Sequence, residues 1–198
     1  MIRVITGPAV EPVTLDEIKL HCRIDHNDED DYLTSLIAAA RQFCETFTGQ
    51  SFITQTLEYD LQKWPSGRAI HLPRPPVQTI GEVKYVDEDG VDVPLIAGDD
   101  YLADTDSILA RVVLPTGKTW PTETMYPVNP IVVTFTAGYG LAIAVPEYIK
   151  AAIKLLVAVY YENRENVLPA GHVGKTLPMG IDALLWQHRT FWTPELNK

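Results

Sequence analysis

The chain has 198 residues, of which 46% are hydrophobic, and these values are those of an ordinary globular protein with one sizeable core or two small ones. Its formal charge of -10 and its lack of any basic run argue against tight binding to a nucleic-acid backbone as the main function. The most apolar window, residues 141–161, is broken by a proline and three charged residues, so we expect no membrane span. With no signal-peptide pattern at the N-terminus, we expect a soluble protein made in the cytosol.

Residues 1–51 are predicted to form N-terminal helices. The sequence TLDE, residues 14–17, has the form of a capping box, in which a threonine hydroxyl and a glutamate satisfy the free amides at a helix start. A second, longer helix is predicted to run from the acidic residues 28–31 to Gly49, because apolar residues recur there at helical spacing. They are Leu33, Leu36, Ile37, Ala40, Phe43, Cys44 and Phe47. Cys44 and Cys22 are interpreted as small core residues in a reducing compartment.

Residues 52–140 are predicted to form an inserted antiparallel β domain, sandwich-like, between the helical segments. The period changes to two residues over residues 54–61, and a turn follows at residues 64–67. Residues 82–95 read as a hairpin around the sequence DEDG. Residues 107–115 and 131–140 supply further strands.

Residues 141–166 are predicted to hold a third helix that completes the helical core, with Pro146 as its first residue. Its apolar residues cover most of its circumference, which is more than one amphipathic stripe requires. A second burial partner is therefore expected, either the sheet or another subunit. The predicted fold class is α+β: a small helical bundle with an inserted antiparallel β-sheet and a C-terminal tail helix.

The sequence YYENRE at the end of the third helix has two interpretations. Arginine and aromatic residues are enriched at subunit interfaces, so Tyr160, Tyr161, Arg164 and Glu165 could form an intersubunit contact. The alternative is a solvated helix end whose charges contribute little to stability.

Residues 167–198 are predicted to be a linker followed by a docking tail. The tail holds half of the four tryptophans, and Ile181, Leu184, Leu185 and His188 fall at helical spacing, with Trp192 one turn further on the same side. So short a helix is marginal in water, so we expect the tail to be mobile alone and to fold on a partner. Trp186, Phe191 and Trp192 are candidate anchors. The alternative is that the tail packs on its own domain.

No motif in the chain supports catalysis, a metal or a cofactor. The sequence DHNDEDD lacks the glycine and the final glutamate of a calcium loop. The two GKT sequences lack the earlier glycine of a phosphate loop, and the five histidines show no ligand spacing. We therefore expect no catalytic, cofactor or metal site.

The order of several sequences along the chain resembles the head-tail connector (adaptor) proteins of tailed bacteriophages, in the subgroup with a β-rich insertion between helices. They are VTLDEIKLHCRIDHNDEDDYLTSLIAAARQFCETFTGQ, VKYVDEDG, FTAGYG, VPEYIKAAIKLLVAVYYENRE and LPMGIDALLWQHR. The resemblance implies a structural virion protein without catalytic activity, assembled in the host bacterial cytoplasm. It implies a ring, a dodecamer, beneath the portal at the head-tail junction, with DNA passing through the lumen without specific binding.

The resemblance also implies partners for particular residues. The C-terminal segment of the family engages the portal protein, which places a portal-binding site on Leu184, Leu185, Trp186, Arg189, Phe191 and Trp192. A head-closure or tail protein is expected below the ring, and an acidic body suits a DNA conduit because like charges repel. Two alternatives stay open: a head-closure or tail-completion protein, or a carbohydrate-binding β-module that uses Trp64, Trp120 and Tyr126 as stacking platforms.

Overall fold

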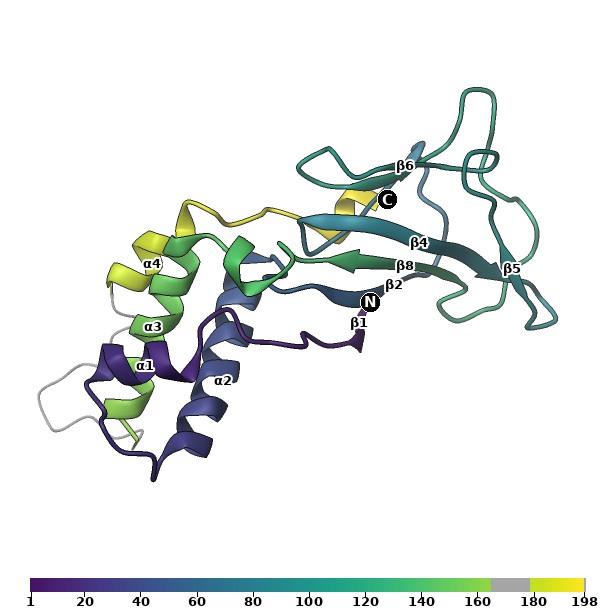
Figure 1. The fold of residues 1–198 in the computed structure, drawn as a ribbon. Coiled ribbons are helices and arrows are strands. Elements are labelled where there is room, and N and C mark those ends of the chain that lie inside the picture. Colours follow the sequence, from purple (N-terminus) through teal and green to yellow (C-terminus); the bar gives the residue numbers. More distant parts are fainter. Residues whose placement is uncertain (165–178, 198) are drawn as a thin grey trace, which may run out of the picture. The chain divides into compact units, whose positions relative to one another are not determined.

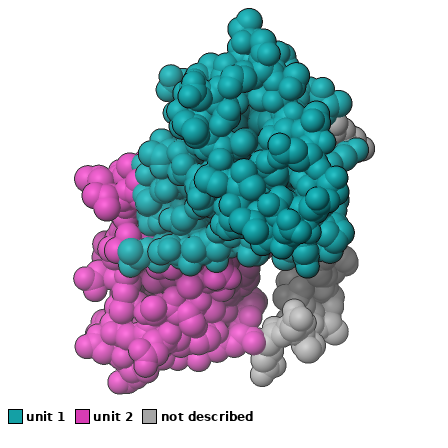
Figure 2. Space-filling view, turned by 90° about the vertical axis from the view of Figure 1, so that its right-hand side faces the viewer, with its two compact units in different colours: residues 1–9, 49–139, 191–198 teal, residues 10–48, 140–190 magenta. Residues whose placement is uncertain are grey.

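The computed structural model describes residues 1–164 and 179–197, and within them the chain has the predicted α+β fold (Figure 1). It divides into two compact units (Figure 2). The helical unit comprises residues 10–48 and 140–190, and the sheet unit comprises residues 1–9, 49–139 and 191–198. The predicted insertion, residues 52–140, therefore forms most of the sheet unit. Both chain ends also join that unit, which the predicted boundaries did not include.

The helical unit begins with the two predicted N-terminal helices. Helix α1, Leu15–Cys22, starts with the predicted capping box, in which Thr14 and Glu17 bond each other's backbone amides, and Ile18 is fully buried. Helix α2, Asp30–Thr48, buries Leu33, Ile37 and Cys44, while Phe43 and Phe47 of the same pattern are only half-buried. Burial raises the pKa of the Cys44 thiol to about 12, which suits the predicted core role.

Helix α3, Glu147–Glu162, lies at the centre of the helical unit and contacts α1, α2 and helix α4, Met179–Trp186 (Figure 1). Pro146 was predicted to be the first residue of this helix. It is instead the N-cap, and the helix begins one residue later, at Glu147. Ile153 and Leu156 are buried in α3, and Ile181 and Leu185 are buried in α4. A second burial partner was expected for this helix in the sheet or another subunit, but α1 and α4 of its own unit take that place. A short 3-10 helix, η1, Ala142–Ala144, precedes α3.

The sheet unit is built around a five-stranded antiparallel sheet in the order β1-β2-β8-β4-β5. Its strands are β1, Ile2–Thr6; β2, Gln55–Leu61; β4, Val77–Val86; β5, Asp92–Pro94; and β8, Ile131–Ala137. Strands β4 and β5 form the predicted hairpin, and β2 and β8 are the other long predicted strands. Strand β1 was not predicted, because its five residues show no clean alternation and four of them are exposed.

A second sheet of three short strands has the order β3-β7-β6. Its strands are β3, Ala69–His71; β6, Leu102–Asp104; and β7, Arg111–Val113, and only β7 lies in a segment predicted as a strand. Strands of three residues carry too little pattern to be distinguished from loops. Both sheets contribute to one core, which includes Leu57, Tyr59, Leu61, Ile70, Leu72, Val83, Tyr85, Val112, Ile131, Val133 and Phe135.

Gly138 ends β8 at a point where no side chain fits. Its φ is +124°, and a Cβ built there would lie 2.4 Å from the carbonyl oxygen of Ile53. The glycine in FTAGYG is therefore explained by close backbone approach.

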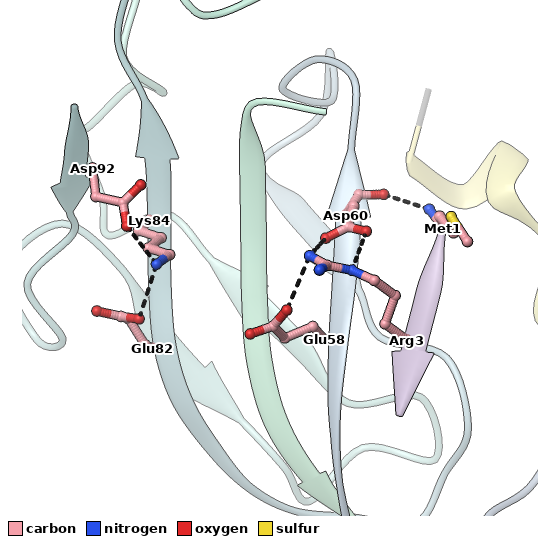
Figure 3. A network of polar contacts seen from close by, with 7 residues as sticks. All are labelled: Met1, Arg3, Glu58, Asp60, Glu82, Lys84 and Asp92. Atoms are coloured by element: carbon pink, nitrogen blue, oxygen red, sulfur yellow. Dashed lines mark hydrogen bonds and ion pairs between the residues drawn. The ribbon is translucent and has the colours of Figure 1, made fainter. Parts of the chain in front are cut away.

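Two groups of charged side chains lie on strands of the large sheet (Figure 3). In one group Arg3 pairs with Asp60 through two hydrogen bonds of 2.7 and 2.9 Å, and with Glu58 at 2.9 Å. In the other, Lys84 lies 2.6 Å from Asp92 and 3.8 Å from Glu82. Bidentate pairing of a guanidinium with a carboxylate fixes geometry as well as charge, so the Arg3 side chain is held across the sheet toward β2.

Candidate functional site

The predicted docking tail begins as a helix packed on its own unit. Leu185 is fully buried and Leu184 is half-buried, so these two predicted portal-binding residues are largely used in packing α4. The helix ends at Trp186, where Arg189 donates a backbone hydrogen bond to Trp186. The next amide, Thr190, bonds the Thr48 carbonyl at 2.7 Å and directs the chain away. The predicted extension of the helical stripe to Trp192 is therefore wrong.

An aromatic cluster forms where the end of α2 meets α4, and we call Phe43, Phe47, Trp186 and Arg189 the aromatic patch. The ring centroids of Phe43 and Phe47 are 6.3 Å apart, and those of Phe47 and Trp186 are 6.4 Å apart in an edge-on arrangement. The Arg189 guanidinium lies 5.3 Å from the Trp186 centroid and 5.7 Å from that of Phe47. Trp186 remains 57% exposed.

An open pocket of about 460 Å³ lies beside the aromatic patch. It is lined by Phe47, Asp182, Ala183, Trp186 and Gln187. Trp186 lines this hollow and Arg189 lies over its ring, and tryptophan and arginine are residue types in which interface energy concentrates. The sequence analysis missed the contribution of Phe43 and Phe47, because it read them as core positions of α2. Their signal was the clustering of two phenylalanines one turn apart near the end of that helix.

The last two predicted anchors, Phe191 and Trp192, lie in the sheet unit and not with Trp186. The Trp192 ring packs edge-on against Tyr59 at 5.5 Å, and its indole nitrogen donates a hydrogen bond to the His71 carbonyl at 3.2 Å. Trp192 is therefore committed to its own unit, as the alternative interpretation of the tail had it. Phe191 is 69% exposed.

Asn197, in the 3-10 helix η2, Pro194–Asn197, fastens the end of the chain to β3. Its side-chain oxygen accepts from the His71 amide at 2.7 Å, and its side-chain nitrogen donates to the His71 carbonyl at 3.0 Å and to the Tyr59 hydroxyl at 3.2 Å. An amide side chain thus takes the place of a strand partner at this sheet edge. No sequence pattern indicated this role.

The predicted subunit-contact cluster has partners within the helical unit. Arg164 and Tyr161 each donate a hydrogen bond of 2.5 Å to Glu29, and the guanidinium lies 4.9 Å from the ring centroids of both Tyr32 and Tyr161. These two hydrogen bonds hold the pKa of Glu29 below its ordinary value, and the bond from Tyr161 has the larger effect. Tyr160 is half-buried, and burial raises the pKa of its hydroxyl.

The cluster is therefore an internal fastening between the end of α3 and the segment before α2, and Arg164 is not merely solvated. The exposed faces of Tyr161 and Arg164 remain candidates for a subunit contact. Glu165, the fourth predicted residue, lies outside the described residues, as does the predicted linker at residues 167–178.

The tryptophans of the carbohydrate-binding alternative do not form an open platform. Trp64 and Trp120 stack on each other with centroids 4.9 Å apart and an angle of 4° between the rings. Trp120 is buried and donates its indole hydrogen bond to the Gly67 carbonyl at 2.9 Å. A sugar ring would need the faces that these two rings already cover for each other. Tyr126 is exposed, but it is not part of this stack.

Within residues 1–164 and 179–197, no group of three or more histidine, cysteine, aspartate or glutamate side chains is placed to hold a metal ion. Among the same residues, no helix is both long enough and apolar enough to cross a membrane.

Comparison with known proteins relates the chain to phage connectors. Residues 12–84 match the family described as "Phage gp6-like head-tail connector protein". No curated protein gives a significant match.

Three solved structures resemble the chain over nearly its whole length. One, from a virion of a native gene transfer agent particle, is 28% identical with a TM-score of 0.79 and covers 98% of this chain and 97% of that chain. A second, from the neck of an empty particle computed with C6 symmetry, is 28% identical with a TM-score of 0.80 and full coverage of both chains. The third, from the neck of the native particle computed with C12 symmetry, is 26% identical with a TM-score of 0.75, also with full coverage. These findings confirm the predicted resemblance to the head-tail connector family.

Proposed function

We propose, from this resemblance to the head-tail connector family, that the chain is a structural protein of the head-tail junction of a phage-like particle. The observation that carries the proposal is the similarity of the complete chain to proteins in the necks of gene transfer agent particles. The match to a connector family over residues 12–84 supports it independently, since that segment includes parts of both units. The role is architectural, and it needs no catalytic group or cofactor.

In this role the chain forms a ring of twelve copies beneath the portal. The similarity to neck structures computed with C12 and C6 symmetry supports cyclic repetition of the fold. A cyclic ring closes through a head-to-tail contact in which each copy presents two different surfaces to its neighbours. The exposed sides of Tyr160, Tyr161 and Arg164, with Glu165 beside them in sequence, are proposed to contribute to one such surface.

The portal-docking surface is proposed to be the aromatic patch. Of the six residues first assigned to the portal, Trp186 and Arg189 belong to this patch. Trp186 leaves more than half of its surface open to a partner. Leu184 and Leu185 pack α4, the helix that carries Trp186. Phe191 is exposed in the sheet unit and is proposed as a separate portal contact. Burying an exposed tryptophan beside an arginine is a common source of binding energy at protein interfaces.

The charge of the chain fits a conduit for DNA. A formal charge of -10 gives a ring of twelve copies a strongly negative field, which discourages adhesion of a polyanion to the ring. DNA is therefore proposed to pass through the lumen without specific binding, and a head-closure or tail protein is proposed to bind below. Assembly takes place in the host cytoplasm, and the mature location is the virion neck.

The experiment that tests this role mixes the chain with two baits: the purified portal protein of the same particle, and that portal bearing a preformed connector ring made of another chain of the particle. A connector binds the bare portal, with twelve copies per portal ring by mass measurement. A head-closure or tail-completion protein binds only below an existing connector ring. Failure of the chain to bind bare portal would overturn the connector assignment, and binding only below another ring would favour the alternative.

A further inference from the structure

The outer edge of β1 differs from the other sheet edges of the molecule. Strand β5 has three residues and carries Pro94, and β6 also has only three residues. The edge of β3 is occupied by the Asn197 side chain, which takes both the amide and the carbonyl of His71. Strand β1 has five residues, contains no proline or lysine, and pairs on one side with β2. Among the described residues, no strand pairs with its other side.

The hydrogen-bond pattern shows which backbone groups face outward. Met1 and Asp60 exchange two backbone hydrogen bonds, of 2.6 and 2.8 Å, so they form a hydrogen-bonded pair of the antiparallel ladder. Such pairs alternate along a ladder, which makes Arg3 the next residue bonded to β2. The amides and carbonyls of Ile2 and Val4 therefore point away from the sheet. An extended segment laid along this edge would find them ready to bond.

The side chains of β1 leave this edge open. Val4 and Ile5 are 59% and 53% exposed. Natural edge strands are usually protected by a charged side chain or a proline that obstructs further pairing. The charge available here, Arg3, is held across the sheet by its two hydrogen bonds to Asp60 (Figure 3). Arg3 therefore does not obstruct the pairing of a further strand with the outer edge of β1.

The charge of the segment indicates what could occupy the edge. Residues 1–10 contain Arg3 and no acidic residue, in a chain whose formal charge is -10. Another copy of this acidic chain is repelled by most of the surface, and Arg3, which pairs with Glu58 and Asp60, reduces that repulsion along β1. We propose that the outer edge of β1 accepts an extended segment from the neighbouring copy in the ring, which continues the five-stranded sheet across the subunit boundary. Pairing of β1 with a second β1 would be two-fold and would not close a ring, so the neighbour contributes a different segment.

This inference rests on the proposed ring, and its test uses Val4→Pro. Proline at residue 4 removes an outward amide, but it leaves the bonds of Arg3 to β2 intact. Val4→Lys retains the amide and adds the charge that protects natural edges. Val128→Lys is the matched control, because Val128 is 63% exposed in the same unit but lies outside β1. Each variant is mixed with the portal protein of the same particle, and native mass spectrometry measures copies per portal and the affinity of the first copy.

Both β1 variants are expected to bind the portal as single copies with unchanged affinity and to keep the wild-type melting temperature. Contact between neighbouring copies is expected to weaken roughly tenfold, which corresponds to about 1.4 kcal/mol, so that portals carry incomplete rings. If Val4→Pro or Val4→Lys fills the portal as completely as the wild type, the edge proposal is overturned while the connector role stands. An equal loss in Val128→Lys would also overturn it. If the wild-type chain binds no portal, the connector role fails and the edge proposal fails with it.

Discussion

The aromatic patch leads to a contrast between two adjacent residues of α4. Trp186 is 57% exposed, whereas Leu185 is fully buried against the helical unit. A tryptophan side chain can bury up to about 250 Å², so roughly 140 Å² of Trp186 is available to a partner. At about 25 cal/mol per Å² this area gives an upper value near 3.5 kcal/mol. We therefore expect Trp186→Ala to weaken portal binding by about 2–3 kcal/mol, which is roughly 30- to 150-fold.

The matched variant Leu185→Ala should behave in the opposite way. Truncating a buried leucine typically costs about 2–5 kcal/mol of folding stability, whereas Trp186→Ala should cost about 1 kcal/mol, because much of its ring is already in water. Calorimetric titration of each variant into purified portal, together with urea unfolding of the free chain, separates the two effects. Trp186→Ala that binds the portal with wild-type affinity would refute the assignment of the aromatic patch as the docking surface.

Three further predictions concern contacts within the sheet unit and contacts within the helical unit. Asn197→Ala should destabilise the chain by about 1–3 kcal/mol in urea unfolding, because it leaves buried polar groups unpaired, whereas the exposed control Thr193→Ala should change little. Arg164→Glu places an acid beside Glu29 and should lower the melting temperature, and adding Glu29→Arg should restore much of the loss; equal melting of both would contradict the pair. The pKa of Glu29 is depressed by its bonds from Tyr161 and Arg164, so its contribution to stability is complete above its ordinary pKa of 4.5 and is lost as the pH falls through the lower, folded-state value. Glu29→Gln should remove this part of the acid sensitivity, and an unchanged difference from the wild type between pH 7 and pH 3 would be evidence against it.

The sequence predicted the elements that carry strong periodicity. The capping box at Thr14, the long helix α2 and the helix after Pro146 are present, and so are the hairpin of β4 and β5 and the strands β2 and β8. In each of these segments, many residues repeat one pattern or a turn motif marks the boundary. Strands β1, β3 and β6 were missed, because short strands that depend on their neighbours have no pattern of their own.

The candidate site was predicted in part. The C-terminal segment was identified from its aromatic content, and Trp186 and Arg189 do lie on an exposed surface. Helical spacing could not show that the helix ends at Trp186, because the hydrogen bond from Thr190 to Thr48 joins residues far apart in sequence. For the same reason it could not show that Trp192 belongs to the other unit. Tertiary contacts between distant segments decided which aromatic rings stay exposed.

The aromatic content of the tail therefore has two explanations within one segment. Trp192 completes the core of the sheet unit beside Tyr59, and Trp186 contributes to the aromatic patch of the helical unit. The expectation that the whole tail is mobile until it meets its partner is not what the structure shows for residues 179–197, which pack on the two units. Deleting the tail should accordingly lower folding stability as well as portal binding.

The measurement that tests the central claim most directly is a cryo-electron microscopy map of the intact particle, averaged around the axis of its neck. The account predicts twelve copies of this fold in one ring in contact with the portal, with Trp186 at that contact. A neck ring built from another chain, with this protein elsewhere in the particle or absent from it, would contradict the account.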